Sequence, residues 1–237
     1  MQANPIISII LPCYNPVEGW KQIVRDNYEK LNQEIGPAEL IIVNDGSTKH
    51  FDDIEVKAFF AAYPYVNLIS YDQNQGKGYA LREGVKHART ELITYTDIDF
   101  PYTFESFLHI VTELKNPDCD LAVGIRNSAY YTHLPSGRTR ISKFFRFFIR
   151  KFFRLPTDDT QCGLKGFKGI GKSVFLQTAI NGYLFDLEFI FLASRQKAGI
   201  KTVEVELQAD RQLSQMRWTV LLQEAGNFMK IFVQSIF

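Results

Sequence analysis

Two carboxylates separated by one residue, Asp97 and Asp99, follow an apolar stretch of the chain at residues 92–96. Mg²⁺ and Mn²⁺ prefer oxygen ligands, and they often bind through one or two carboxylates together with the phosphates of a nucleotide. The pattern therefore favours a divalent metal site, where the metal would neutralise the charge of a departing diphosphate. A surface loop or a helix N-cap is the competing interpretation, because aspartate is common in both.

A third aspartate, Asp45, lies in the segment Asn-Asp-Gly-Ser at residues 44–47. Taken alone, this segment indicates a turn in which Gly46 supplies a positive φ angle. The functional interpretation is that Asp45 accepts hydrogen bonds from the base or ribose of a nucleotide.

A glycine-flanked lysine, Lys77, lies in Asn-Gln-Gly-Lys-Gly at residues 74–78. Backbone amides and an ammonium group in such a loop could contact a phosphate. The competing interpretation is a solvated loop that opens a helix near Tyr79.

Two more polar clusters occur later in the chain, at residues 158–163 and 185–188. The first precedes a strand-like stretch at residues 164–167 and could face a donor sugar or an acceptor, or cap a turn. The second, with Asp186 and Glu188, begins an apolar helix that should run to Ala198 and stop at Gly199. Acidic residues in a first turn commonly cap their own helix.

Short apolar, β-branched stretches predict the strands that would position these groups. They are residues 6–11, 40–43, 66–70, 92–96 and 121–123. Alternation with helical segments predicts an α/β fold with a mostly parallel sheet and helices on both faces. Because ligands bind at the carboxyl ends of parallel strands, the polar groups after residues 11, 43 and 96 should converge.

Composition indicates one ordinary globular domain that spans residues 1–237. Hydrophobic residues make up 46% and charged residues 22% of the 237, which excludes disordered and fibrous classes. The three cysteines have no metal-ligand spacing and suggest no disulfide framework. We expect no secretory signal and no spanning helix, and hence a cytoplasmic protein.

Positive charge is concentrated at residues 138–154, which carry seven Lys or Arg and no acidic residue, although the net charge is only +1. Arg138, Arg140, Lys143 and Arg146 belong to this segment, and phenylalanines occupy much of the rest of it. A helix with this pattern suits an anionic membrane interface and could offer arginines to a lipid phosphate. Alternatively, the rings pack on the sheet and the charges stay in water. The amphipathic segment at residues 218–237 poses the same choice.

Nucleic acid is not an expected partner, because no reader motif is present.

The order of these motifs resembles glycosyltransferase family 2. The matching segments are residues 8–15, 41–47, 74–78 and 96–99, and residues 158–167 with 185–188 resemble its polyprenyl- and dolichyl-phosphate sugar synthases, especially the dolichyl-phosphate β-glucosyltransferases. The resemblance implies a GT-A, Rossmann-like fold. It also implies a nucleotide-sugar-binding half at about residues 1–130 and an acceptor-binding half at about residues 131–237.

The resemblance also implies residue roles. The donor nucleotide-sugar would be bound by Pro12, Tyr14, Asn15, Asp45, Lys77, Asp97, Ile98, Asp99 and Gln161. Asp97 and Asp99 would hold Mg²⁺ or Mn²⁺, Arg126 would lie near the phosphates, and Asp159 would face the transferring sugar. Asn44, Pro16 and the Phe100-Pro101 pair depart from the family pattern, so the details of base recognition and of auxiliary ligands are open.

The implied function is inverting transfer of a hexose, with UDP-sugar favoured, to a membrane lipid phosphate such as polyprenyl phosphate. If the acceptor is instead a hydroxyl of a saccharide or lipid, Asp159 becomes the candidate base. A nucleotidyltransferase and a catalytically silent nucleotide-sugar-binding or membrane-adaptor protein are the rivals. The expected location is peripheral, on the cytoplasmic face of a membrane, with a membrane-anchored partner or a second copy of the chain as candidate protein partners.

Overall fold

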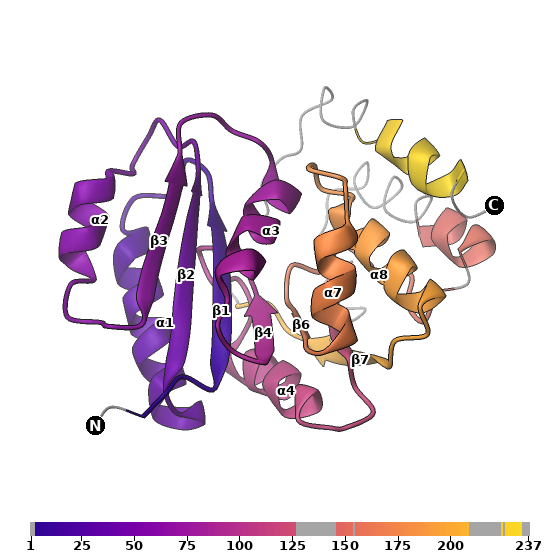
Figure 1. Ribbon diagram of the computed structural model, residues 1–237, viewed down its shortest axis with the longest axis horizontal. Helices are drawn as coiled ribbons and strands as arrows, with labels where there is room; N and C mark the ends of the chain where they lie inside the picture. Colours follow the sequence, from indigo (N-terminus) through magenta and orange to yellow (C-terminus); the bar gives the residue numbers. More distant parts are fainter. Residues whose placement is uncertain (1–2, 127–145, 154, 209–223, 225, 234–237) are drawn as a thin grey trace.

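A single twisted sheet organises the computed structural model (Figure 1), which describes residues 3–126, 146–153, 155–208, 224 and 226–233. Within these residues the sheet has seven strands in the order β3-β2-β1-β4-β6-β5-β7. The strands are β1 (Ile7–Cys13), β2 (Ala38–Asp45), β3 (Val66–Tyr71), β4 (Leu92–Tyr95), β5 (Leu121–Arg126), β6 (Lys165–Phe167) and β7 (Ile200–Val205). All five predicted strands and the strand-like stretch at residues 164–167 are therefore confirmed.

The sheet is mostly parallel, as predicted. β1 pairs in parallel with both β2 and β4, β2 with β3, and β5 with β7. β6 is the exception, because it inserts antiparallel between β4 and β5. β7 was not predicted, because its residues are mostly partly buried or exposed and lack a continuous apolar run.

Helices cover both faces of the sheet, which confirms the predicted layering (Figure 1). Buried side chains of β1 alternate between two cores, so that Ile10 points to one face and Ile9 and Leu11 to the other. On the Ile10 side lie α3 (Lys77–His87), α7 (Ile170–Gln177) and α8 (Phe185–Arg195). On the opposite side lie α1 (Trp20–Ile35), α2 (Asp53–Phe59) and α4 (Phe104–Leu114).

Two further helical segments, residues 146–152 and the described residues of 224–233, pack beside α8. Phe153 contacts Phe191 of α8 and Phe228, with ring centroids 5.7 Å apart in each pair. Ile149 and Ile231 are buried in the same core. The described part of the C-terminal segment thus packs on the domain. None of the helices in the described part of the chain is long and apolar enough to span a bilayer.

All three cysteines, Cys13, Cys119 and Cys162, are buried free thiols. This agrees with the expectation that no disulfide framework supports the fold. Burial raises the pKa of the Cys119 thiol to about 11 and that of the Cys13 thiol to about 12. These thiols therefore stay protonated near neutral pH and serve as small apolar side chains.

Candidate functional site

The loops after β1 and β2 are joined at the carboxyl edge of the sheet. β1 lies between β2 and β4 and is parallel to both, so the loops that follow all three strands emerge at the same edge. The Asn15 side-chain oxygen accepts hydrogen bonds from the backbone amides of Thr48 (2.8 Å) and Lys49 (2.9 Å). In return, the Asn15 amide donates to Ser47 Oγ. Asn15 therefore fixes one loop against the other, while the neighbouring residue Tyr14 is 53% exposed.

Asp45, at the end of β2, holds the loop that follows β3. Its carboxylate accepts hydrogen bonds from Asn74 Nδ2 (2.8 Å), the Gln75 amide (2.7 Å) and the Gly76 amide (3.0 Å). Gly46 adopts a φ of 67°, and a Cβ there would lie 2.6 Å from the Asn74 nitrogen. The turn expected at Gly46 is thus present. Because Asp45 is almost fully buried, its first effect is to order the segment that leads into Lys77.

Lys77 connects this segment to the paired aspartates. It is the first residue of α3, and its ammonium lies 2.5 Å from Asp97 Oδ1. Burial alone would lower the pKa of Lys77, but the charges of Asp97 and Asp186 outweigh it and raise the pKa above its usual value. The ammonium is therefore charged near neutral pH. Asp45 and Asp97, distant in sequence, are joined through Gly76 and Lys77 at one edge of the sheet.

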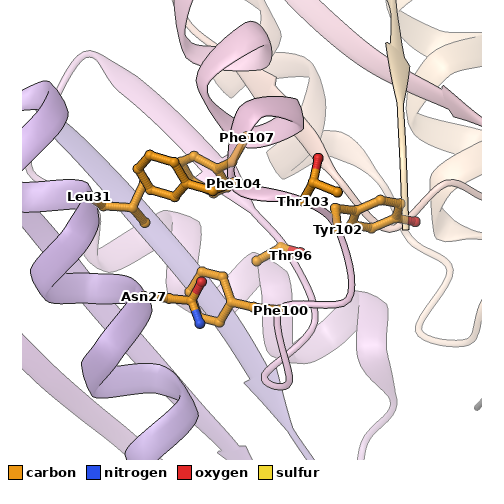
Figure 2. A pocket seen from close by; sticks show the side chains of 8 residues that line it. All are labelled: Asn27, Leu31, Thr96, Phe100, Tyr102, Thr103, Phe104 and Phe107. Atoms are coloured by element: carbon orange, nitrogen blue, oxygen red, sulfur yellow. The ribbon is translucent and has the colours of Figure 1, made fainter. Parts of the chain in front are cut away.

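The turn that carries Asp97, Ile98 and Asp99 rests on a layer of aromatic side chains. The Phe100 amide donates to the Asp97 carbonyl at 2.9 Å, and Phe100 has a left-handed φ of 46°. Figure 2 shows Phe100, Phe104 and Phe107 facing Asn27 and Leu31 of α1 around a cavity of about 10 Å³. That volume holds no more than about one water molecule. The layer supports the turn and leaves no room for a substrate beneath it.

The paired carboxylates fit a nucleotide-associated Mg²⁺ or Mn²⁺. Among the residues that the structure describes, no group of three or more His, Cys, Asp or Glu side chains could form a cage made by protein alone. Two carboxylates that leave other positions for phosphate and water oxygens are typical of nucleotide-bound Mg²⁺. The Lys77 ammonium on Asp97 also shows that this carboxylate attracts a cation. The other carboxylate oxygen of Asp97, Oδ2, lies against Gly163, where an added Cβ would be only 2.8 Å away from it.

Arg126 and Asp159 form a tightly bonded pair at the end of β5. Asp159 accepts hydrogen bonds from the Arg126 amide (2.8 Å), Nε (3.0 Å) and Nη2 (2.5 Å). Burial would raise the pKa of Asp159, but the hydrogen bonds and charge of Arg126 outweigh burial and lower it below its usual value. A carboxylate that is ionised and already accepts three hydrogen bonds is a poor proton acceptor near neutral pH. The pair is suited to positioning.

A buried network behind Lys77 was not identified from sequence. Lys165 is fully buried, and its ammonium donates to the Cys162 carbonyl (2.5 Å) and to Asp186 Oδ1 (2.7 Å). Tyr95 donates its hydroxyl hydrogen to the same carboxylate oxygen. Asp186 therefore does not cap α8, although its place in the first turn suggested capping. Only the presence of a lysine in an otherwise apolar strand could have signalled a buried partner.

Glu188 also bonds to another segment. Its Oε2 accepts hydrogen bonds from the amides of Ala179 (2.9 Å) and Ile180 (2.8 Å). Arg82 of α3 donates to the Ile180 carbonyl at 2.9 Å, and the Gly78 amide donates to the Asn181 carbonyl at 2.8 Å. The segment at residues 178–181 is thus fastened to the start of α3, which limits movement of the backbone around Lys77.

The basic residues assigned to an acceptor are described only in part. Arg146 donates to Asp158 Oδ1 from Nε (2.9 Å) and Nη2 (2.6 Å), so it fixes its helix to the segment before Asp159. Arg138, Arg140 and Lys143 lie outside the described residues. Gln161 is partly buried, two positions after Asp159.

Comparison with known proteins identifies both family and fold. The family model described as glycosyl transferase family 2 matches residues 8–177. A dolichyl-phosphate beta-glucosyltransferase of Trichomonas vaginalis is 27% identical over 96% of this chain and 73% of its own length. The enzyme of that name from Saccharomyces cerevisiae is 26% identical over 84% of this chain and 66% of its own length. The chain thus spans about two thirds to three quarters of these relatives.

Among solved structures, glucosyl-3-phosphoglycerate synthase from Mycobacterium tuberculosis aligns with a TM-score of 0.62 and 18% identity. The alignment covers 98% of this chain and 78% of that one, whose structure contains Mn²⁺, UDP and glucosyl-3-phosphoglycerate. At this identity the likeness establishes the fold. The GT-A fold and the family resemblance expected from sequence are confirmed.

Proposed function

This chain belongs to glycosyl transferase family 2, and on that basis we propose that it transfers glucose from UDP-glucose to a lipid phosphate such as dolichyl phosphate, with inversion at the anomeric carbon. The main support is structural: Asp45 binds the loop that leads into Lys77, and Lys77 contacts Asp97, so these groups lie together at one edge of the sheet. The curated relatives, named for glucosyl transfer to dolichyl phosphate, support the choice of sugar and acceptor.

Asp97 and Asp99 would hold a divalent ion that neutralises charge on the departing nucleoside diphosphate. Lys77 would add a second positive charge to the diphosphate, and its fixed backbone would keep that charge in place. Tyr14 and Asn15 lie on the joined loops, where they would line the site of the base together with Pro12. Ile98 would contribute backbone between the two aspartates, and Gln161 would contact the transferring sugar.

The geometry of Asp159 favours an acceptor that is already ionised. A phosphate monoester has a second pKa of roughly 6 and is largely dianionic near neutral pH, so its oxygen needs no general base. Asp159, which is bound by Arg126, would keep that guanidinium oriented toward the phosphates. A hydroxyl acceptor would require a base, and the hydrogen bonding of Asp159 argues against that role.

Other parts of the proposal concern the acceptor side. Residues 1–130 would bind the donor and residues 131–237 the acceptor, with Arg138, Arg140, Lys143 and Arg146 near the lipid phosphate. The protein would work peripherally at the cytoplasmic face of a membrane, where a lipid phosphate can be presented to it. A membrane-anchored protein or a second copy of the chain would be compatible with this location.

The test is an assay with radiolabelled UDP-glucose, Mn²⁺ and a polyprenyl phosphate. The expected products are UDP and a β-linked glucosyl lipid phosphate in equal amounts. The corresponding prenyl alcohol, which lacks the phosphate, serves as the matched acceptor control and should remain unglycosylated. Release of pyrophosphate, preference for the alcohol, or nucleotide binding without turnover across UDP- and GDP-sugars would each contradict the proposal.

A further inference from the structure

An exposed apolar face lies on the two helical segments at residues 146–152 and 224–233. Phe147, Phe152, Met229 and Val233 are 50%, 40%, 55% and 49% exposed. We refer to these four residues as the apolar face. They account for four of the eleven large exposed apolar side chains among the described residues, although the two segments are short. Such clustering is typical of an interaction site, because isolated exposed apolar residues are usually scattered.

Ring contacts hold the two segments side by side. Phe148 contacts Phe228 with centroids 6.4 Å apart, and Phe152 contacts Phe232 at 5.3 Å. Because both pairs advance by four residues in the same direction, the helices run parallel to each other. Their inner sides are anchored to α8 through Phe153. The apolar face is therefore carried on a fixed support (Figure 1, salmon and yellow segments).

All exposed charges described on these two segments are positive. Arg150, Lys151 and Lys230 are exposed, and the Lys151 ammonium lies 5.8 Å from the ring centroids of both Phe147 and Phe152. The single acidic residue, Glu224, accepts hydrogen bonds from the amides of Tyr183 and Leu184. Rings and methyl groups surrounded by basic side chains complement an anionic bilayer, whose headgroups take the charges while its interface takes the apolar groups.

We infer that the apolar face and its basic rim dock on an anionic lipid bilayer. The inference rests on the proposed function, because docking would place the protein where a lipid phosphate is presented. Self-association through the same face is disfavoured, since a two-fold interface would bring Lys151 and Lys230 of one copy toward the same basic surface of the other.

The test is flotation of the full chain with phosphatidylcholine vesicles, with and without phosphatidylglycerol. The wild type should float with the anionic vesicles, and the double variant Phe147→Ser/Met229→Ser should lose at least about tenfold in binding. Lys151→Glu and Lys230→Glu should each bind anionic vesicles about fivefold more weakly than the wild type. Their binding to vesicles of phosphatidylcholine alone should not change. Ile54→Ser, which changes an 80% exposed isoleucine on α2, is the matched control and should float like the wild type.

Glucosyl transfer to a short, water-soluble prenyl phosphate separates this inference from the proposed function. The docking variants should keep that activity and a wild-type circular dichroism spectrum. A wild type that does not float with anionic vesicles, or a double variant that floats as well as the wild type, would overturn the docking surface. A dimer that the Phe147→Ser/Met229→Ser change abolishes would also overturn it, by assigning the face to a second copy.

A separate observation concerns the Lys77–Asp97 ion pair. The ammonium lies on a carboxylate oxygen that is assigned to the metal. The Lys77 backbone has little freedom, because Asp45 binds the preceding amide and Gly78 is bonded to Asn181. A Cβ at Gly76 or Gly78 would meet backbone oxygens at 2.5 or 2.4 Å, which shows how closely the segment is packed. Only the lysine side chain is left to move.

The geometry points to competition between Lys77 and the metal for Asp97, which the nucleotide diphosphate relieves by attracting the ammonium. This inference also rests on the proposed function. Metal and nucleotide should then promote each other's binding, because each favours the arrangement in which Lys77 has left Asp97. Coupling between two sites is reciprocal and commonly amounts to roughly 5- to 150-fold in affinity.

The test is titration of Mn²⁺ followed by electron paramagnetic resonance, which needs no turnover. Without nucleotide, Lys77→Gln should bind Mn²⁺ about tenfold more tightly than the wild type, and UDP should improve its Mn²⁺ affinity much less. Lys49→Gln, which removes an exposed cation from the neighbouring loop, controls for a general loss of positive charge and should behave like the wild type. Unchanged Mn²⁺ affinity and unchanged UDP dependence in Lys77→Gln, or no Mn²⁺ binding by the wild type with UDP, would overturn the competition.

Discussion

Replacing Asp97 with asparagine should reduce metal-dependent glucosyl transfer by about three orders of magnitude. The substitution removes one of the two carboxylates assigned to the metal and leaves the Lys77 ammonium without its closest partner. The product of interest is glucosyl lipid phosphate, measured at saturating UDP-glucose over a range of Mn²⁺ concentrations. Added Mn²⁺ should not restore the lost rate.

The Asp97 side chain is partly exposed, so the asparagine variant should keep its fold and melt close to the wild-type temperature. Asp72→Asn, in the exposed loop after β3, is the matched control and should retain full activity. Activity near the wild-type level in Asp97→Asn would show that the carboxylate does not serve the reaction, and the metal assignment would then be wrong.

Replacing Asp186 with asparagine should destabilise the fold by about 3–5 kcal/mol, because it leaves a buried lysine without its counter-charge. Lys165 is fully buried, and the Asp186 side chain is only 5% exposed. Tyr95 would also lose the carboxylate that accepts its hydroxyl hydrogen. The measurement is the free energy of unfolding from urea denaturation.

The double variant Lys165→Met/Asp186→Asn provides the control, since it removes both charges and leaves no buried ion without a partner. It should recover much of the stability that Asp186→Asn loses, as expected for two residues in direct contact. A loss below about 1 kcal/mol in the single variant would be typical of a solvent-exposed pair and would contradict the burial argument.

Much of the fold followed from local sequence patterns. The strands that precede the site are short apolar runs with polar residues directly after them, and such runs predict both the element and the sheet edge where ligands bind. The order in which the strands pair was harder to predict. β6 is only three residues long, and its antiparallel place between β4 and β5 depends on contacts between distant segments rather than on its own composition.

The paired aspartates were singled out because they directly follow an apolar strand at the edge where ligands bind in parallel sheets, and their metal role stays a prediction. The buried partner of Asp186 was not predicted, because an aspartate in the first turn of a helix usually satisfies local backbone amides. Its actual partner, Lys165, is 21 residues earlier in the chain. Likewise, the sequence left open whether the segment at residues 218–237 contacts the domain, and only the ring contacts of its described residues with Phe148, Phe152 and Phe153 show that it does. A contact between distant segments is hard to predict, because the local sequence of neither segment indicates its partner.

We expect the loops after β1, β2 and β4, together with the start of α3, to bind a metal-diphosphate group jointly. The most direct measurement is a crystal structure of the chain with UDP and Mn²⁺, with anomalous scattering used to locate the metal. We expect an anomalous peak between the carboxylates of Asp97 and Asp99, the Lys77 ammonium on the diphosphate, and the base beside Tyr14. A metal bound elsewhere, or UDP bound away from this edge of the sheet, would contradict it.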